Sequence, residues 1–237
     1  MNFFSKIFKA FSGLQLDTKN PLSGEQLNHV LVSSMYAEQQ SAYLNAYATG
    51  INSSDRKKMV HEYWDVYDRE NAIKILDDLI FRNHDENLNV VFAAFEQQEN
   101  YSDILKSGLP DDQDAFNYYL DYFRQLRDIV PELIEGDVIK DFSELNQCKS
   151  SGWNLGRGAF LARCVYEMEY ITEAELKEYL AKCYSELKQF CTTWKEYTKS
   201  YLFGRAMWQG SHDDGMTYIA EDLLTKDKSP LKNKTNI

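Results

Sequence analysis

The chain has 237 residues, of which 43% are hydrophobic and 27% are charged, and its formal net charge at pH 7 is −11. These proportions are typical of a globular protein and exclude a wholly disordered chain. No run of eighteen apolar residues is present for an ordinary transmembrane helix, and the acidic charge opposes binding to nucleic acid and favours basic partners. We therefore expect a soluble, cytoplasmic protein that does not bind nucleic acid.

Residues 1–20 contain a short amphipathic segment. One face of a helix there would carry five apolar side chains, Phe3, Phe4, Ile7, Phe8 and Phe11. Such a face either contacts a membrane surface through residues 3–11 or packs on the body of the protein. We expect packing on the protein, with membrane contact as the alternative.

Helical periodicity continues through the chain, and the alternating pattern of a half-buried strand is nearly absent. Ser23 is a suitable N-cap for a helix that we expect to end near Gly50, because glycine commonly terminates helices. Asp68 is expected to cap the next helix, since its carboxylate can accept hydrogen bonds from the free amides of the first turn.

Two further signals mark helix ends in the second half of the chain. Pro131 is expected to stop the helix that precedes it. Thr172 and Glu175 form a Thr-x-x-Glu capping box ahead of a long apolar series, which runs from Leu176 to Tyr201 in steps of three and four residues. We expect this seam to pack against other helices of the same chain.

These patterns predict an all-α protein, a compact multi-helix bundle-like array with no significant sheet. A single helical domain over residues 21–225 would consist of two packed halves, about 21–136 and 152–225. Residues 226–237 are rich in lysine, and we expect them to form a disordered basic tail.

The chain shows no pattern of residues typical of a metal or cofactor site. The four cysteines, at positions 148, 164, 183 and 191, form no Cys-x-x-Cys pair and have no histidine at ligand spacing. We expect them to be reduced core residues, and we expect no metal and no cofactor. The sequence also nominates no catalytic residue, because no histidine has a serine or cysteine partner at a recognisable spacing.

Arginine and tryptophan residues accompany the most apolar predicted helices. The candidate binding residues there are Trp153, Asn154, Arg157, Arg163, Trp194, Glu196, Arg205 and Trp208. An arginine in such a helix must reach water or pair with a carboxylate or an aromatic face, because an unpaired buried charge is very costly. The possible carboxylate partners are Asp68, Glu167 and Glu196.

Two interpretations of these arginines remain open. They could line a cleft that recognises a carboxylate, a phosphate or an acidic loop through bidentate hydrogen bonds. They could instead form an internal network with carboxylates that fixes how the helices pack, and this is the interpretation we favour. The glycines at positions 152, 156 and 158 indicate close packing between helices in the same region.

Several ordered segments carry a resemblance to a known family. They are residues 64–70, which include Asp68 and Arg69, and residues 153–157, 161–163, 169–172, 193–196 and 204–208. From about residue 47 to residue 208 the chain resembles a bacterial family called domain of unknown function 1266, and Asp68 and Arg69 join the candidate binding residues on this basis. The chain departs from the family at Asn154, where an acidic residue is usual, and asparagine cannot act as a general base.

The leading functional hypothesis is a non-catalytic protein-binding role, for example as an immunity or accessory protein that neutralises a basic toxin or effector. The first alternative is an enzyme or a small-anion sensor with a pocket around Arg157, Arg163 and Arg205, in which Glu196 would be the acid, the base or a ligand partner. The second alternative is a peripheral membrane protein. The sequence leaves the oligomeric state open.

Overall fold

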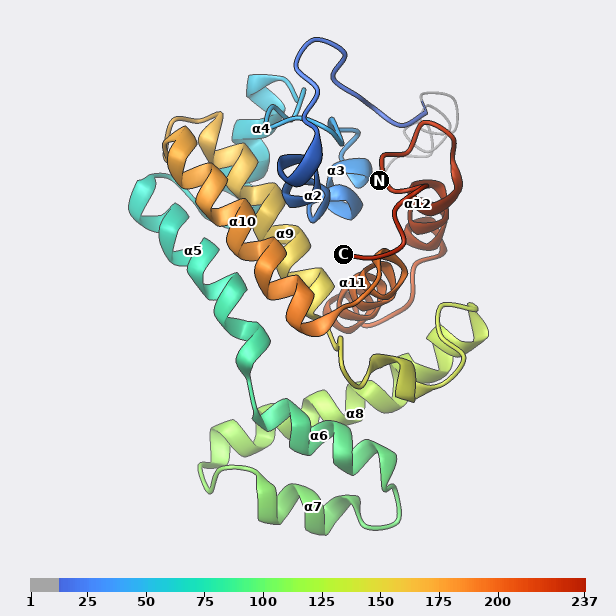
Figure 1. Ribbon diagram of the computed structural model, residues 1–237. Helices are drawn as coiled ribbons and strands as arrows, with labels where there is room; N and C mark the ends of the chain where they lie inside the picture. Colours follow the sequence, from blue (N-terminus) through green and yellow to red (C-terminus); the bar gives the residue numbers. More distant parts are fainter. Residues whose placement is uncertain (1–12) are drawn as a thin grey trace.

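The computed structural model describes residues 13–237, and Figure 1 shows its helices. The membrane contact considered for residues 3–11 lies outside the described residues. The helices are α2 (Gly24–Leu31), α3 (Ser34–Gln39), α4 (Ser53–Lys58), η1 (Met59–Tyr63), α5 (Arg69–Phe81), η2 (Arg82–His84), α6 (Asn87–Glu96), α7 (Tyr101–Gly108), α8 (Gln113–Glu135), η3 (Phe142–Leu145), α9 (Ser151–Tyr166), α10 (Glu173–Phe190), α11 (Trp194–Gln209) and α12 (Asp214–Thr225). Within residues 13–237, the only extended pairing is an isolated bridge between Thr193 and Asn236, so the predicted all-α class is confirmed.

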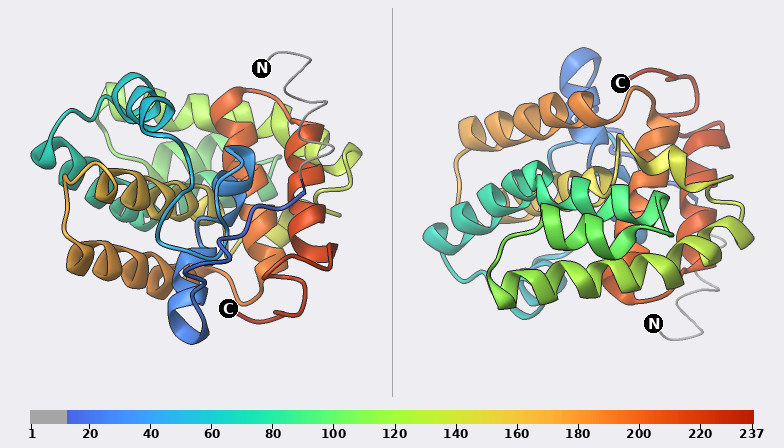
Figure 2. Two further views of the ribbon diagram at one scale, coloured as in Figure 1. Left: turned by 90° about the horizontal axis from the view of Figure 1, so that it is seen from above. Right: turned by 90° about the horizontal axis from the view of Figure 1, so that it is seen from below.

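Helix α9 forms the centre of the fold. It packs against α5, α10, α11 and α3, and the two views of Figure 2 show it enclosed by its neighbours. Fourteen of its sixteen residues are buried. A Cβ atom on Gly152 would lie 2.6 Å from the carbonyl oxygen of Tyr197, so the glycine permits the close approach of α11. The close helix packing that the glycines predicted is confirmed at this position.

The helices do not form two groups in space that correspond to the predicted sequence halves, residues 21–136 and 152–225. Helices α6, α7 and α8 lie together at the end of the molecule opposite α4, as Figure 1 shows. Helices α2 and α3 instead pack against α10, α9 and α12 from the second half of the sequence. The early helices therefore build the main body with the C-terminal helices, and α6 to α8 form a separate layer beneath it.

The helix expected from Ser23 to Gly50 is much shorter in the structure. Helix α2 ends at Leu31, and after α3 ends at Gln39 the chain is not helical until residue 53. The carbonyl oxygens of residues 43, 47 and 48 accept hydrogen bonds from Arg163. Carbonyl groups inside a helix are engaged by the helix itself, so this segment provides three acceptors by staying irregular.

Two other helix boundaries also differ from expectation. Helix α8 passes through Pro131 and continues to Glu135. Val130 and Leu133 on either side of the proline are buried, and their packing offsets the one missing backbone hydrogen bond. The long apolar series is divided between α10 and α11 at residues 191–193.

The predicted capping box at Thr172 and Glu175 is confirmed at the start of α10. Thr193 and Glu196 form a second capping box at the start of α11, which the sequence analysis missed. Asp68 caps α5 by accepting a hydrogen bond from the amide of Asn71, as predicted.

Residues 226–237 are placed against the body, which differs from the disordered tail that was expected. The amide of Trp194 donates to the carbonyl of Thr235 at 3.1 Å, and the amide of Ile237 donates to the carbonyl of Thr192 at 3.0 Å. Leu231 is buried. Because the segment is rich in lysine, its composition did not indicate that Leu231 would be buried or that the backbone near it would pair with residues 192 and 194.

Candidate functional site

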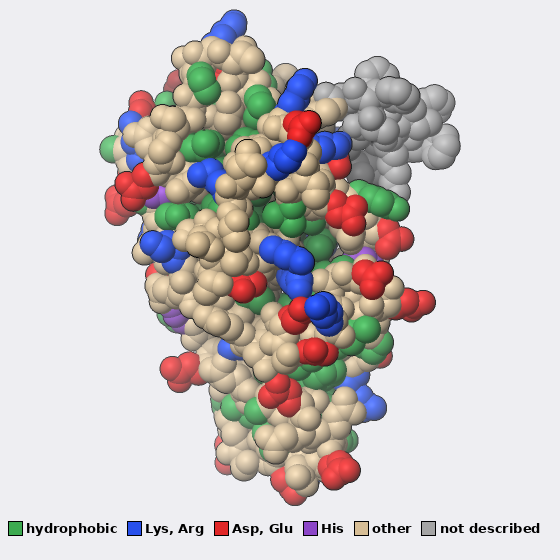
Figure 3. Space-filling view, turned by 45° about the vertical axis from the view of Figure 1, so that its right-hand side comes forward, with side chains coloured by type: hydrophobic (Ala, Val, Ile, Leu, Met, Phe, Trp, Pro, Cys, Tyr) green, Lys and Arg blue, Asp and Glu red, His purple; other side chains and the backbone are tan. Residues whose placement is uncertain are grey.

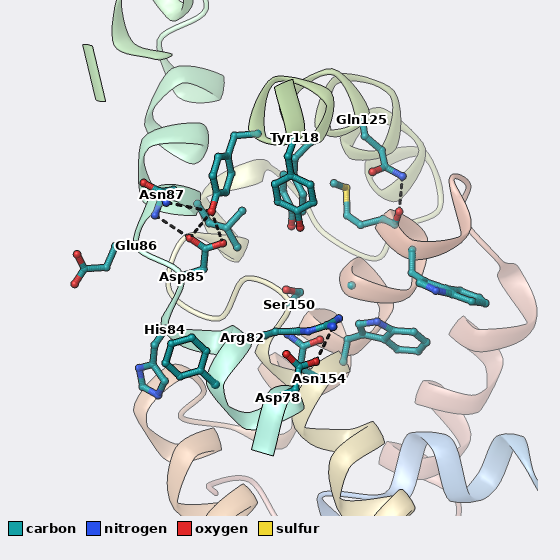
Figure 4. Close-up of a pocket in the computed structure, with 18 of the residues that line it drawn as sticks. Asp78, Arg82, His84, Asp85, Glu86, Asn87, Tyr118, Gln125, Ser150 and Asn154 are labelled. Carbon is teal, nitrogen blue, oxygen red and sulfur yellow. Dashed lines mark hydrogen bonds and ion pairs between the residues drawn. The ribbon is translucent and has the colours of Figure 1, made fainter. Parts of the chain in front are cut away.

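A cleft of about 980 Å³ lies between the main body and α8. It is lined by the end of α5, by η2 and the start of α6, by α8, and by residues of α9 and α11. Figure 4 shows Tyr118 and Gln125 on the α8 side, with Asp78 and Asn154 on the opposite side. Its volume is in the range that holds a drug-sized molecule or a short segment of a protein chain.

Exposed aromatic side chains belong to three separate walls of the cleft. Phe81 at the end of α5 is 76% exposed, Tyr118 on α8 is 61% exposed, and Trp208 at the end of α11 is 66% exposed. Single exposed aromatic residues are common on protein surfaces, but several around one cleft are typical of sites where proteins bind partners. The three rings therefore make this cleft a candidate binding surface.

Arg157 provides a largely buried positive charge in the cleft. Its guanidinium carbon lies 4.2 Å from the centre of the Trp153 ring and 5.5 Å from that of Trp64. One Nη donates to Asn154 Oδ1 at 3.1 Å, and Nε donates to the carbonyl of Trp153 at 3.4 Å. Burial lowers the pKa of Arg157 to about 10, so the group stays charged at neutral pH.

The opposite wall carries a polar cluster around Asp85. The hydroxyl of Tyr119 donates to its two carboxylate oxygens at 3.1 and 3.0 Å, and the backbone amide of Asn87 donates to one of them at 3.1 Å. Figure 4 shows this cluster well apart from Asn154. Near Arg157, Arg82 forms an ion pair with Asp78 at 2.6 Å.

The structure brings four of the candidate residues into this cleft, namely Trp153, Asn154, Arg157 and Trp208. Arg205 lies directly behind them. Its guanidinium carbon is 5.8 Å from the ring centre of Trp153 and 5.6 Å from that of Trp208, and its Nη2 is 3.9 Å from a carboxylate oxygen of Asp213.

Arg163 lies elsewhere, fully buried in the core. It donates to the carbonyl oxygens of Tyr43, Tyr47 and Ala48 and to the hydroxyl of Ser33. The expectation of an internal network is therefore met for this arginine, although its partners are backbone oxygens and a serine and not carboxylates. The cleft that Arg157 lines does not include Arg163.

Glu167, one of the three carboxylates expected to pair with the arginines, accepts a hydrogen bond from Thr49 and lies 3.6 Å from Arg56. Glu196 accepts hydrogen bonds from Thr192 and Thr193 and lines a separate cavity of about 340 Å³. It therefore does not serve as an acid or base beside Arg157.

The remaining candidate residues have structural partners outside the cleft. Trp194 is buried at the start of α11. Arg69 forms an ion pair with Glu175, with one nitrogen to oxygen distance of 2.5 Å and a second of 3.0 Å. Asp68 is occupied by capping α5, so neither residue of this adjacent pair contributes to the cleft.

Sequence analysis missed the residues on the α5 and α8 walls. Phe81 in α5 and Tyr118 in α8 lie close in sequence to the apolar residues that form the buried face of each helix. Their positions do not match the helical repeat of that face, so they are exposed. An aromatic residue at such a position was the available signal. The pairing of Asp85 with Tyr119 had no comparable signal, because 34 residues separate them.

Comparison with known proteins supports the resemblance found in the sequence. The family described as "Protein of unknown function (DUF1266)" matches residues 59–235. The uncharacterized protein YbeR of Escherichia coli (strain K12) is 28% identical in an alignment of length 120 that covers 46% of this chain and 51% of YbeR. The matched region thus spans about half the length of this relative, and no solved structure matches the chain. The chain belongs to the DUF1266 family.

Proposed function

We propose that this protein is a non-catalytic binding protein of the bacterial cytoplasm, and that its cleft holds a segment of a basic protein partner. The observation that carries the proposal is the exposure of Phe81, Tyr118 and Trp208 on three walls of one cleft. Binding energy in protein interfaces is concentrated in a few aromatic and arginine side chains. Rings on three sides can enclose an inserted side chain or loop.

Charge favours a basic partner. The chain carries a net charge of −11, and Asp85, Glu86 and Asp121 lie along the cleft. On the face in Figure 3, acidic, basic and hydrophobic side chains are interspersed, so that face has no single patch of one kind. A basic segment would gain electrostatic attraction during encounter and aromatic contact once inside the cleft. An immunity or accessory protein that neutralises a basic toxin or effector would work in this way.

The proposal is tested by affinity purification from the native host with matched variants. Trp208→Ala removes an aromatic ring that is 66% exposed at the cleft, and Tyr218→Ala removes one that is 67% exposed on α12 and does not line the cleft. We expect a basic protein to bind the unchanged protein and the Tyr218 variant and to be lost with the Trp208 variant. Equal recovery with both variants, or recovery of no partner, would contradict the proposal.

No helix within residues 13–237 is long and apolar enough to cross a membrane.

A further inference from the structure

The positive charge of Arg157 is largely buried in the cleft and has no direct ion-pair partner among the described residues. Within the described residues, no carboxylate lies within ion-pair distance of its guanidinium, although Arg56, Arg69 and Arg82 all have such partners. The two groups that accept its hydrogen bonds, Asn154 and the carbonyl of Trp153, carry no net charge. The carboxylate of Asp78 attracts Arg157 through space, but it lies beyond ion-pair distance and is paired with Arg82. A largely buried charge without a direct ion pair is costly, and an anion from outside would compensate for it.

The guanidinium is also held in a fixed orientation. Its central carbon lies over the ring of Trp153 at 4.2 Å from the ring centre, and Asn154 accepts a hydrogen bond from one edge. The second Nη has no hydrogen-bond partner among the described residues, and the side chain lines the cleft. A guanidinium held by an aromatic contact and two hydrogen bonds keeps its remaining donors preorganised for a planar, bidentate acceptor, which is the geometry of a carboxylate.

Arg82 reinforces this side of the cleft. It lines the same cavity, it is close enough to Arg157 for the two charges to repel, and its only ion-pair partner among the described residues is Asp78. The carboxylates of Asp85 and Glu86 lie on another part of the wall, as Figure 4 shows. One end of the cleft thus has two arginines, Arg157 and Arg82, with one carboxylate, Asp78, and the wall at Asp85 and Glu86 is acidic.

We propose that Arg157 anchors a carboxylate group of the molecule that occupies the cleft, with Arg82 as a second positive charge beside it. The carboxylate comes either from the end or an acidic side chain of a protein segment or from a small organic acid. The inference rests on the proposed function only in taking the cleft as the binding site. A partner that is basic overall is compatible with it, because its basic side chains would face the acidic wall at Asp85 and Glu86.

The direct test is the NMR signal of the Arg157 Nε–Hε group, recorded while a charged probe and its neutral twin are added to the full chain. Phenylacetate and phenylacetamide differ in charge but hardly in shape. We expect phenylacetate to shift the Arg157 signal in a saturable way and phenylacetamide to leave it unchanged. No shift with phenylacetate, or the same shift with both probes, would overturn the inference.

Matched variants separate Arg157 from general charge effects. Arg157→Gln should weaken phenylacetate binding by about tenfold or more, whereas Arg127→Gln, which removes an exposed arginine outside the cleft lining, should not weaken it. Equal binding by the two variants would overturn the role of Arg157. If Arg157→Gln fails to fold, the comparison of the two probes on the unchanged protein still decides. Inorganic phosphate that binds Arg157 more tightly than phenylacetate would also overturn the choice of a carboxylate.

The two sources of the carboxylate are distinguished with a peptide probe. Acetyl-Lys-Phe with a free terminal carboxylate should bind more tightly than its C-terminal amide and more tightly than phenylacetate if the occupant is a chain end. If the occupant is a small organic acid, phenylacetate should bind and the peptide should not. Either result supports the recognition of a carboxylate by Arg157. Carboxylate binding without any protein partner would contradict the proposed function alone, whereas partner capture with an unresponsive Arg157 would contradict this inference alone.

Discussion

Arg163 Nη2 donates a hydrogen bond to the carbonyl oxygen of Tyr43 at 2.6 Å, across 120 residues of sequence. This contact and those to Tyr47, Ala48 and Ser33 join the centre of α9 to the irregular segment between α3 and α4. A single buried guanidinium therefore organises a stretch of chain that has little regular structure of its own.

Replacement of Arg163 by methionine should destabilise the protein strongly. The change leaves three backbone carbonyl groups and one hydroxyl without their donor in the core, and we expect a loss of about 3–5 kcal/mol in the free energy of unfolding. Chemical denaturation measures it. Arg124→Met, which removes an exposed ion pair with Asp121, should cost less than about 1 kcal/mol. Similar losses for both variants would show that Arg163 does not hold this segment.

Two glycines of α9 should respond to alanine in opposite directions. At Gly152 a Cβ would lie 2.6 Å from the backbone oxygen of Tyr197, so Gly152→Ala should cost about 1–3 kcal/mol by forcing α9 and α11 apart. At Gly158 the nearest atom, Cys183 Sγ, would lie 3.6 Å away, which is ordinary contact. Gly158→Ala should therefore be neutral or stabilise by up to about 1 kcal/mol, because alanine favours the helix. The melting temperatures of the two variants, measured by thermal unfolding, should therefore shift in opposite directions from that of the unchanged protein, or only that of Gly152→Ala should fall.

The ion pair between Arg69 and Glu175 should make stability depend on pH in the acid range. Its hydrogen bonds from Arg69 and Thr172 hold the pKa of Glu175 at about 2, against 4.5 for an ordinary glutamate. A lowered pKa in the folded state stabilises the protein above pH 4.5, and this contribution is lost as the pH falls toward 2. We expect Arg69→Gln to lower the melting temperature at neutral pH and to have progressively less effect below pH 4.5.

The control for this prediction is the same substitution in a Glu175→Gln background. There the charge that Arg69 recognises is already absent, so Arg69→Gln should change the melting temperature equally at all pH values between neutrality and pH 2. A difference between wild type and Arg69→Gln that stays constant with pH in the original background would refute the assignment.

The four buried cysteines should differ in reactivity. A hydrogen bond from the Cys191 thiol lowers the pKa of Cys148, which also lines the cavity of about 340 Å³ near Glu196. Burial raises the pKa of Cys164 and of Cys183 to about 12. Because the thiolate is the reactive form, iodoacetamide should label Cys148 first in the folded protein. Mass spectrometry of partly labelled protein gives the order, and faster labelling of Cys164 or Cys183 would contradict it.

Local signals in the sequence predicted much of the fold. The capping residues Asp68 and Thr172 start helices as expected, and Gly152 marks a close helix contact, because these effects depend on neighbouring residues or on one packed pair. The irregular segment before α4 was not predictable in this way. Its conformation depends on Arg163, more than a hundred residues away, and no local pattern encodes that contact.

Only the part of the candidate site that has local sequence signals could be predicted, because the rest depends on contacts between distant residues. Trp153, Arg157 and Trp208 stand out in the sequence and meet in one cleft. Arg163 has the same residue type and a similar setting, yet it faces the core, since the direction of each side chain depends on which helices surround α9. The α8 wall with Tyr118 was missed because it approaches α9 only in the folded chain.

The measurement that tests the central claim most directly is site-specific photo-crosslinking in the native host. A photoreactive benzoylphenylalanine is placed at Phe81, which is 76% exposed in the cleft, or at Tyr63, which is 69% exposed outside it. We predict a discrete crosslink to a basic protein from position 81 that is absent from position 63 and is lost when Trp208→Ala is added. Crosslinks to the same protein from both positions, or none from position 81, would contradict the assignment of this cleft as the binding site.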